Sequence, residues 1–393
     1  MSIRTTTCAI AVSLTLSQAA LAADSATDPV VLSFATVGDS RQDPANPDPT
    51  TLDPVTKALS GQDAIWLQNT RVWSRMMREI QKQAPNFLFF NGDMIMGYGK
   101  ASLPADTTTV GNIVSSDLMQ FYRQYGFWRG MVANLMETGT YVVPVPGNHE
   151  TQWKAGGKIA VVENENAWRD NMGDLILDTQ RMQNLFGKGP DASDITDHAK
   201  LDGLTTDQSK LSYSFDFGDN HFAIINTDAT GFDAKAPVGW LESDLAAASA
   251  RGAKHVFVFG HKPAFTYYYG TATALPTSPS GLDKSTDLTN RDQFWSLIEK
   301  YNATYFCGHE HIYNAMQPVK TDGKPSKNWQ VIVGSGGSPF EAKTTDVTKN
   351  PATDRSYAWA LVKVYKSGRV TATINGFNDK MEKTQPYKWL QLP

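Results

Sequence analysis

Short apolar runs that end at glycine alternate along the chain with stretches of helical periodicity. The first run, VVLSFATVG from Val30 to Gly38, is rich in β-branched residues and predicts a buried strand. A helical stretch from Gln62 to Gln83 follows and ends before Pro85. The same alternation continues with NFLFFNGD, a helix near 115–137, TYVVPVPGNHE, a helix near 239–250, KHVFVFGHKP, a helix near 291–301 and ATYFCGHEH. Strands that alternate with helices predict a layered α/β fold.

Further segments with the sequence pattern of strands lie between and after these strand–helix units. LSYSFDFGDNHFAIINTD reads as a hairpin with strands at 212–217 and 222–225, and the C-terminal third adds NWQVIVGSGGSP, YAWALVKVYKSG and RVTATINGF. We therefore expect two sheets packed face to face as a sandwich with helices outside, in α/β/β/α order. Residues 28–393 are expected to form a single domain.

Three longer segments interrupt this frame, at residues 96–115, 151–210 and 265–290. Loops of this length in a compact domain are usually functional or disordered. The middle insert has a helical pattern over Glu165 to Phe186 and is expected to be a lid or flap.

The first 22 residues have the pattern of a signal peptide. Arg4 provides the positive charge, Cys8 to Leu16 is mostly apolar, and Ala20 to Ala22 forms a small-x-small cleavage site. No other run reaches the roughly 18 apolar residues of a membrane span. We expect a chain that is exported to the periplasm or secreted, without a membrane anchor after cleavage.

Charge and cysteine content narrow the classes of function. Without residues 1–22 the chain has 35 basic and 40 acidic residues, a net charge of −5, which argues against a nucleic-acid-binding protein. Cys307 is then the one cysteine left, so no internal disulfide is expected. Nothing in the sequence indicates an oligomeric state.

Polar residues follow the predicted strands, where ligands bind in open α/β sheets. In chain order they are Asp39, Asp93, Asn148 with His149, His261, and His309 with His311. Carboxylate, amide and imidazole donors suit ions such as Zn, Mn or Fe. A pair of such ions can hold the attacking and leaving oxygens of a phosphoryl displacement. These residue types indicate hydrolysis of a phosphate ester.

The ordered blocks GDSR, NGDM, GNHE, GHKP and GHEH resemble the calcineurin-like metallophosphoesterase superfamily, and most closely its purple acid phosphatase branch. The resemblance implies that Asp39 and His311 bind a first metal ion and that Asp93 bridges two ions. It likewise implies that the second ion is held by Asn148, His261 and His309. His149 would act near the leaving-group oxygen, and a hydroxide held by the metal ions would attack phosphorus.

Two positions depart from the resemblance. Arg41 stands where most relatives have a histidine, and Met96 stands where the purple branch has a tyrosine. A guanidinium group cannot ligate a metal ion, and a thioether is a poor ligand for hard ions. Arg41 therefore either binds substrate phosphate as a catalytic residue or takes the place of a weakly held first ion.

The expected function is a secreted phosphoesterase that uses one or two ions of Fe, Zn or Mn to hydrolyse a small phosphorylated substrate, with phosphomonoesters preferred. A phosphodiesterase or nucleotide hydrolase using the same site is one alternative. A catalytically silent protein that binds a phosphorylated ligand is another.

Overall fold

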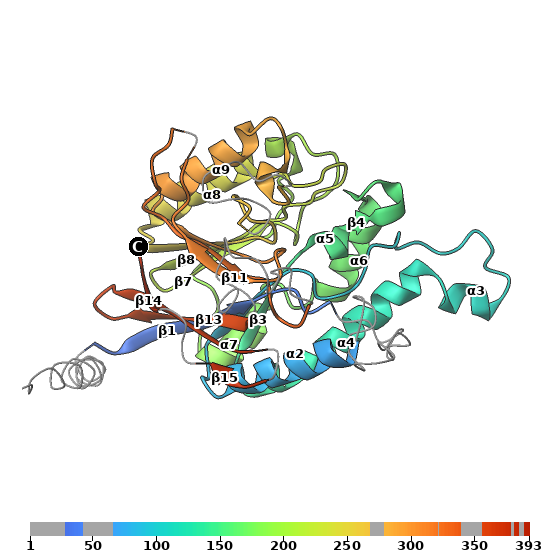
Figure 1. Ribbon diagram of the computed structural model, residues 1–393, viewed down its shortest axis with the longest axis horizontal. Coiled ribbons are helices and arrows are strands. Elements are labelled where there is room, and N and C mark those ends of the chain that lie inside the picture. The colour runs from blue at the N-terminus through green and yellow to red at the C-terminus, as the bar shows by residue number, and fades with distance from the viewer. Residues whose placement is uncertain are drawn as a thin grey trace, which may run out of the picture.

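The computed structural model confirms the predicted two-sheet architecture (Figure 1). The structure describes residues 28–41, 66–267, 279–320, 322–338, 356–378, 381–384 and 389–393. The segment expected to be a signal peptide, residues 1–22, lies outside these ranges, as does part of the insert expected at 265–290.

The first sheet joins the two ends of the described chain. Its strands run in the order β15-β14-β13-β1-β2-β3, and β16 also pairs with β14. The three consecutive strands β1, β2 and β3 are parallel, whereas the C-terminal strands pair antiparallel. The bounds are β1 (Val30–Val37), β2 (Phe87–Asn91), β3 (Tyr141–Val145), β13 (Tyr357–Tyr365), β14 (Val370–Phe377), β15 (Lys383–Thr384) and β16 (Trp389–Leu392).

The second sheet has the order β11-β12-β10-β9-β8-β7-β6. Strands β8, β9, β10 and β12 are mutually parallel, and the predicted hairpin forms β7 and β8. The bounds are β6 (Ala192–Asp194), β7 (Tyr213–Phe217), β8 (Asn220–Ile224), β9 (His255–Phe259), β10 (Thr304–Cys307), β11 (Tyr313–Met316) and β12 (Gln330–Val333). A separate small hairpin is made by β4 (Gln152–Trp153) and β5 (Ile159–Ala160).

Helices cover the outer faces of both sheets. In Figure 1, α8 and α9 lie on the side of the second sheet, and α2 and α4 lie on the side of the first. The helices are α2 (Trp66–Gln81), α3 (Val110–Val114), α4 (Asp117–Glu137), α5 (Asn148–Thr151), α6 (Val162–Met172), α7 (Thr179–Phe186), α8 (Val238–Arg251) and α9 (Thr289–Lys300). Short 3-10 turns occur at η2 (Lys154–Gly156), η3 (Ala199–Asp202) and η4 (Leu282–Lys284).

Phenylalanine rings fill the space between the sheets. The ring of Phe89 on β2 stacks on Phe259 of β9 with centroids 3.9 Å apart. Phe34 on β1 makes edge-to-face contacts with Phe257 and Phe306 of the opposite sheet, at 5.0 and 5.8 Å. All of these rings are buried. Each contributes about 1.5–3 kcal/mol of burial free energy, so these contacts clamp the two sheets together.

Phe34→Ala is expected to lower the free energy of unfolding by about 3–5 kcal/mol, because the lost ring leaves a cavity between the sheets. Urea unfolding followed by circular dichroism measures the change. Phe232→Ala is the matched control, since that ring is 36% exposed and should cost less than about 1 kcal/mol. Equal losses in the two variants would contradict the clamping role of Phe34.

The middle insert is packed into the core instead of forming a flap. The helix expected over 165–186 is two helices, α6 and α7, because α6 ends at Gly173 and Asp178 caps the next helix by accepting the Arg181 N–H at 2.9 Å. Trp168 and Met172 of α6 are fully buried in the same core as β1 and β2. The lid expectation for this part of the insert was therefore wrong.

A buried ion network ties the hairpin of the second sheet to α8. His221 on β8 lies between the carboxylates of Asp216, at 2.6 Å, and Asp244, at 2.9 Å. Arg251 binds the other oxygen of Asp216 at 2.6 Å, and Ser214 donates to Asp244. Burial disfavours the imidazolium, but the two aspartates more than offset it and raise the pKa of His221. The histidine is structural, as its place in a strand suggested.

His221→Leu should lower the free energy of unfolding by about 3 kcal/mol, because two buried carboxylates lose their shared cation. The raised folded-state pKa means that the stabilisation is complete below the unfolded value of about 6.5 and is lost as pH rises through the folded value. Urea unfolding at about pH 6 and about pH 9 should therefore give a smaller difference between wild type and variant at the higher pH.

The control for this titration is His255→Gln, since burial lowers the pKa of His255. A difference between wild type and His221→Leu that does not shrink with rising pH would contradict an imidazolium at this position.

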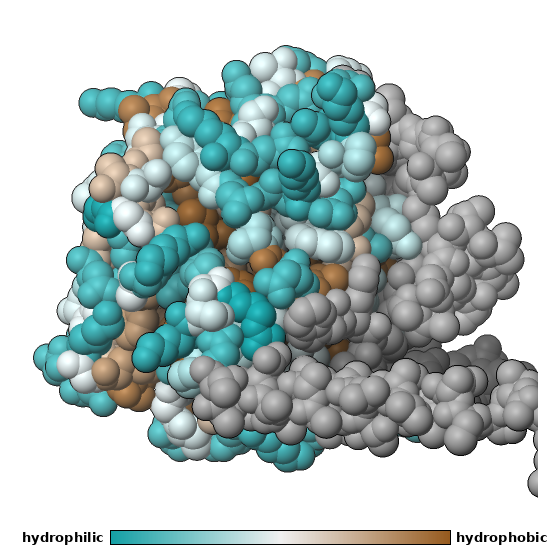
Figure 2. All heavy atoms as spheres, turned by 90° about the vertical axis from the view of Figure 1, so that its left-hand side faces the viewer, coloured by the Kyte–Doolittle hydropathy of each residue, from teal (hydrophilic) through white to brown (hydrophobic). Residues whose placement is uncertain are grey.

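The face of the molecule on the left-hand side of Figure 1, where β1 and β14 lie, is largely hydrophilic, with separate apolar areas between polar side chains (Figure 2). Among the described helices, none combines the length and apolar character required to cross a membrane.

Candidate metal centre

Loops that follow parallel strands of both sheets meet at one edge of the sandwich. β1, β2 and β3 in the first sheet are parallel neighbours, and so are β9 and β10 in the second, so their carboxyl ends open on the same region. The structure brings all the predicted ligand residues together there, namely Asp39, Asp93, Asn148, His261, His309 and His311.

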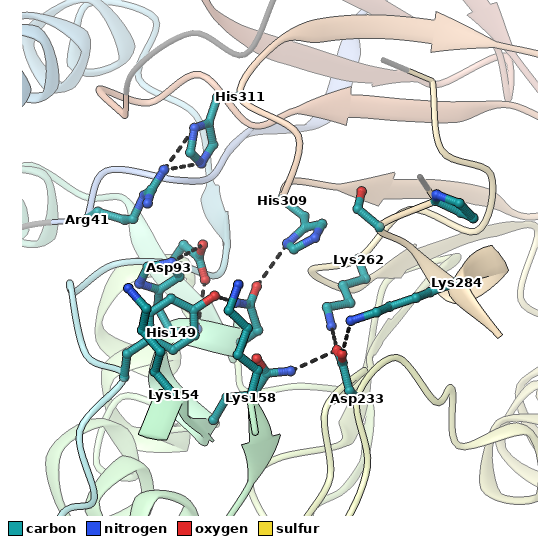
Figure 3. A pocket seen from close by; sticks show the side chains of 15 residues that line it. Arg41, Asp93, His149, Lys154, Lys158, Asp233, Lys262, Lys284, His309 and His311 are labelled. Carbon is teal, nitrogen blue, oxygen red and sulfur yellow. Dashed lines mark hydrogen bonds and ion pairs between the residues drawn. The ribbon is translucent and has the colours of Figure 1, made fainter. Parts of the chain in front are cut away.

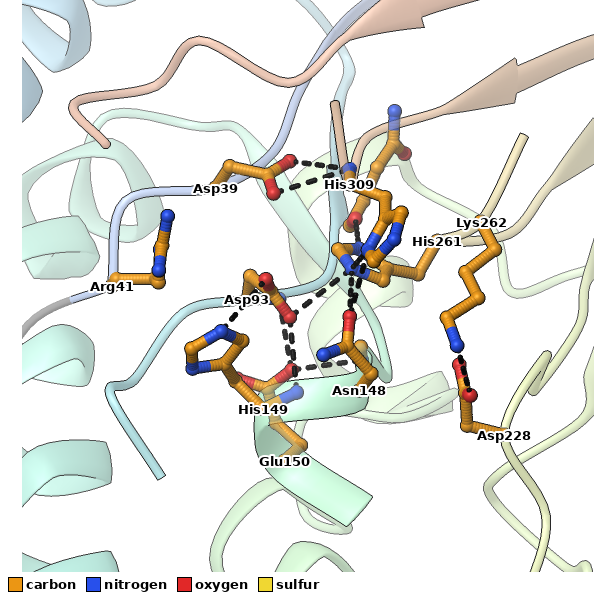
Figure 4. Close-up of polar contacts among 12 residues, drawn as sticks. Asp39, Arg41, Asp93, Asn148, His149, Glu150, Asp228, His261, Lys262 and His309 are labelled. Carbon is orange, nitrogen blue, oxygen red and sulfur yellow. Dashed lines mark hydrogen bonds and ion pairs between the residues drawn. The ribbon is translucent and has the colours of Figure 1, made fainter. Parts of the chain in front are cut away.

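Three donor groups converge beside Asp93 (Figure 4). The Oδ1 atom of Asn148 lies 2.8 Å from Nε2 of His261 and 2.9 Å from Nδ1 of His309. The same Nε2 lies 3.2 Å from the carboxylate of Asp93. Nδ1 of His261 donates to the carbonyl oxygen of Asn91 at 2.7 Å, which directs Nε2 to the centre. These four groups match the expected second metal site.

A second group of donors shares Asp93 and lies on the other side of it. Oxygen and nitrogen atoms of Asp39, Asp93 and His311 all lie within 4.8 Å of one another. The carboxylate of Asp39 is held by the backbone N–H of His309, at 3.0 and 3.1 Å from its two oxygens. These residues match the expected first site.

The charges of this cluster fit a cation. Burial raises the pKa of Asp39 well above its usual range. Burial also acts on Asp93, but the nearby His149 and His261 outweigh it and keep the pKa of Asp93 well below its usual range. For His261 the aspartates overcome burial and raise the pKa to about 10. Two buried carboxylates thus draw positive charge to their centre, and the oxygen and imidazole donors suit Zn, Mn or Fe.

The ligand loops adopt backbone conformations that aim these side chains inward. Asp39, Asp93 and His309 have φ values of 65°, 54° and 70°, in the left-handed region that non-glycine residues seldom occupy. A Cβ atom at Gly308 would lie 2.2 Å from Oδ2 of Asp39, so glycine is required where the two sheets meet. Backbone strain concentrated at three of the predicted ligands marks the site as functional.

Glu150 joins two of the ligand loops, because its buried carboxylate accepts hydrogen bonds from backbone N–H groups of both. The donors are the N–H groups of Asp93, Met94 and Gly147, each at 2.8 Å, and of Ile95 at 3.2 Å. One side chain therefore sets the spacing between the bridging aspartate and the loop that carries the amide donor. From the sequence, Glu150 is expected to be a supporting or solvated residue, and the structure shows that it supports the loops.

A comparison with models of known protein families shows the family to which this chain belongs. Residues 66–313 match the model of the family described as calcineurin-like phosphoesterase, which is more than half of the chain. The protein is a calcineurin-like phosphoesterase. A comparison with curated protein sequences gave no significant match.

Solved structures with a similar fold include a purple acid phosphatase from seeds of yellow lupin (Lupinus luteus), with 14% identity and a TM-score of 0.54. The alignment covers 92% of this chain and 53% of that protein, so the chain spans about half its length. GAP50, the anchor in the inner membrane complex of Plasmodium, gives 14% identity, coverage of 92% and 88%, and a TM-score of 0.46. At these identities the likeness concerns the fold alone.

Arg41 lies at the expected first site of this phosphoesterase. Its Nη2 atom is 2.6 Å from Nε2 and 2.9 Å from Nδ1 of His311, and its Nε donates to Oγ of Ser338 at 3.0 Å. The guanidinium group thus brings a permanent positive charge against the ring nitrogens of His311, where a first metal ion would bind. The contact favours the interpretation in which Arg41 takes the place of a first ion.

We expect wild-type protein, loaded with Mn or Zn and freed of excess metal, to hold about one ion per chain by elemental analysis. Arg41→Ala should raise the value to about two, because removal of the cation releases the His311 ring and ends a repulsion of about 3 kcal/mol per unit charge at about 5 Å. Arg123→Ala on the outer surface is the control. Two ions in wild type, or an unchanged content in Arg41→Ala, would instead assign Arg41 to substrate phosphate.

Tyr98 is a residue of the site that sequence reasoning missed. Its hydroxyl is hydrogen bonded to the Nδ2 group of Asn148, and its ring lies against His149 with centroids 3.8 Å apart. The amide of Asn148 is thereby held with Oδ1 toward the metal donors. Burial raises the pKa of Tyr98, so the hydroxyl stays protonated. An aromatic residue between Gly97 and Gly99 was the available signal.

Tyr98→Phe should weaken metal binding by about tenfold, because supporting residues of metal ligands typically contribute 10–100-fold. Isothermal titration calorimetry with Mn or Zn measures the affinity. Tyr122→Phe is the matched control, since that hydroxyl binds Asp170 on the surface. Equal affinities in wild type and Tyr98→Phe would show that the amide needs no such support.

A cavity of about 480 Å³ opens beside the metal centre (Figure 3). Arg41, Asp93, Asn148, His149, His309 and His311 line it on the side of the centre. The rest of its wall is mainly polar and carries Gln152, Lys154, Lys158, Asp233, Lys262 and Lys284. The cavity has room for a substrate considerably larger than a phosphate group.

Proposed function

We propose that the protein is an exported, metal-dependent phosphoesterase that hydrolyses small phosphate esters, phosphomonoesters in particular. The observation that supports this most is the convergence of buried carboxylate, amide and imidazole donors at the mouth of a basic cavity, in a chain of the calcineurin-like phosphoesterase family. Export rests on the pattern of residues 1–22.

Asp93, Asn148, His261 and His309 would hold the principal ion, with Asp39 and His311 beside them. When bound, an ion of Fe, Zn or Mn supplies a Lewis acid that lowers the pKa of water and neutralises phosphoryl oxygens. The chain's own contribution is orientation: Glu150 sets the loop spacing and Tyr98 the amide. Arg41, Lys154 and Lys158 on the cavity wall attract the anionic ester.

His149 is the proposed proton carrier. Its Nδ1 donates to the carbonyl oxygen of Met96 at 2.6 Å, and its Nε2 lies 3.6 Å from Asp93 at the cavity wall. Burial and Arg41 lower the pKa of His149 to about 3, so the ring is neutral at neutral pH. Nε2, which faces the cavity, can then relay a proton from solvent to the leaving-group oxygen as the P–O bond breaks.

The test is release of nitrophenol from p-nitrophenyl phosphate and bis(p-nitrophenyl) phosphate, with Mn or Zn. We expect turnover of the monoester that falls by about 100-fold or more in Asp93→Asn and after chelation, and by about 10–100-fold in His149→Ala. Glu163→Gln, which removes a surface ion pair with Lys100, is the control.

The outcomes separate the alternatives. Faster hydrolysis of the diester would contradict the monoester preference and keep the enzyme class. Hydrolysis of neither ester by metal-loaded wild type would contradict the proposal and favour a silent binding protein. Full activity of His149→Ala on the monoester would remove His149 from the proposed mechanism.

A further inference from the structure

The hairpin of β4 and β5 places two lysines on the cavity wall without a counter-charge. β4 and β5 are joined by a turn in which Lys154 begins η2 and Lys158 N–H donates to the carbonyl oxygen of Trp153 at 3.1 Å, so both lysines belong to one short connection. Neither ammonium group has a hydrogen bond or ion pair within the described part of the chain. Both side chains are exposed and line the cavity, so an anion bound in the cavity would meet two positive charges from this turn.

The other two lysines of the cavity wall are already neutralised. Lys262 is buried and binds Asp228 at 2.7 Å and Asp233, and Lys284 also binds Asp233. Gln152 donates to both aspartates at 2.9 Å. Figure 3 shows Lys262 and Lys284 directed at Asp233, on the side of the cavity opposite Lys154 and Lys158. The excess positive charge therefore belongs to the hairpin pair.

The hairpin is fixed to the frame of the site by its backbone. Lys154 N–H donates to the carbonyl oxygen of Tyr98 at 3.0 Å, and Ala160 exchanges hydrogen bonds with the segment after β8, to Phe232 and from Gly231. Tyr98 in turn contacts the metal ligand Asn148. The backbone that carries the two lysines is thus fixed beside the metal centre, and both side chains line the same cavity.

From this geometry, and resting on the proposed function, we propose that the preferred substrates carry a second phosphate group, which Lys154 and Lys158 bind while the first lies at the metal centre. A neutral alcohol as leaving group would leave this pair of charges unmatched. A second phosphate supplies the missing negative charge, two charges as a terminal ester or one as the inner phosphate of an anhydride, and lysine binds phosphate as a point charge. The second phosphate belongs to a phosphoanhydride or to a second ester on the same molecule.

Two matched pairs of compounds test the proposal and separate these sources. AMP and ADP differ by an anhydride-linked phosphate, and fructose 6-phosphate and fructose 1,6-bisphosphate differ by a phosphate ester. For wild-type, metal-loaded protein we expect kcat/KM for the bisphosphorylated member of at least one pair to exceed that of its partner by about tenfold or more. The pair that shows the preference identifies the source.

The preference should fall by about tenfold in Lys154→Gln combined with Lys158→Asn, and should survive in the Lys154→Arg, Lys158→Arg variant, which keeps both charges. Asparagine is chosen at position 158 because Lys158 has a φ of 60°, a left-handed conformation that asparagine adopts more readily than most residues. Lys327→Gln is the control, an exposed lysine that does not line the cavity. The absence of a preference in both pairs, or its survival in the neutral double variant, would overturn the proposal.

Binding measurements keep this result apart from failure of the proposed function. Absence of phosphate release by wild type from every compound, including p-nitrophenyl phosphate, counts against the phosphoesterase alone. Isothermal titration calorimetry then measures the affinity of the protein for each compound of the two pairs. Equal affinities for the two members of both pairs would overturn the proposed phosphate subsite.

Discussion

Stacking of aromatic rings between the two sheets is the contact on which the rest of the structure depends. Phe89 and Phe259 lie face to face on strands that each lead into a ligand loop, β2 toward Asp93 and β9 toward His261. The distance between those loops is therefore set by ring thickness in the core, a quantity that close packing keeps nearly constant. The centre needs side chains from both sheets, so its geometry depends on this separation.

The centre adds an electrostatic requirement to that packing. Asp39 and Asp93 are buried, and the side chains around them carry too little permanent positive charge to balance two carboxylates. Burial of these carboxylates is therefore unfavourable unless a cation binds between them. Arg41 meets part of this need from within the chain, through its place on His311. The Arg41 side chain and a metal ion thus compete for one position. The site is therefore asymmetric: Asp93, Asn148, His261 and His309 form an intact donor set, whereas the half with Asp39 and His311 already has the charge of Arg41.

Much of this could be predicted from the sequence, since strand ends are marked by apolar runs that stop at glycine. The alternation of elements predicted both sheets, and the order of polar residues after the strands predicted which side chains meet. What the sequence could not show was set by tertiary contacts. Tyr98 reaches Asn148 through a turn with left-handed residues, and Trp168 of α6 packs into the core that also contains residues of β1 and β2. The contact of Arg41 with His311 joins residues that are 270 positions apart, so no local sequence pattern could predict it.

The hairpin of β4 and β5 is joined to its surroundings through main-chain groups at Tyr98, Gly231 and Phe232. Its side chains at positions 154 and 158 contribute little to folding, so they can be exchanged without disturbing the ligands. Related enzymes could therefore diverge in substrate range through a few codons in this hairpin, while the chemistry of the centre stays unchanged. The same property makes the hairpin a natural place to graft new recognition in protein engineering.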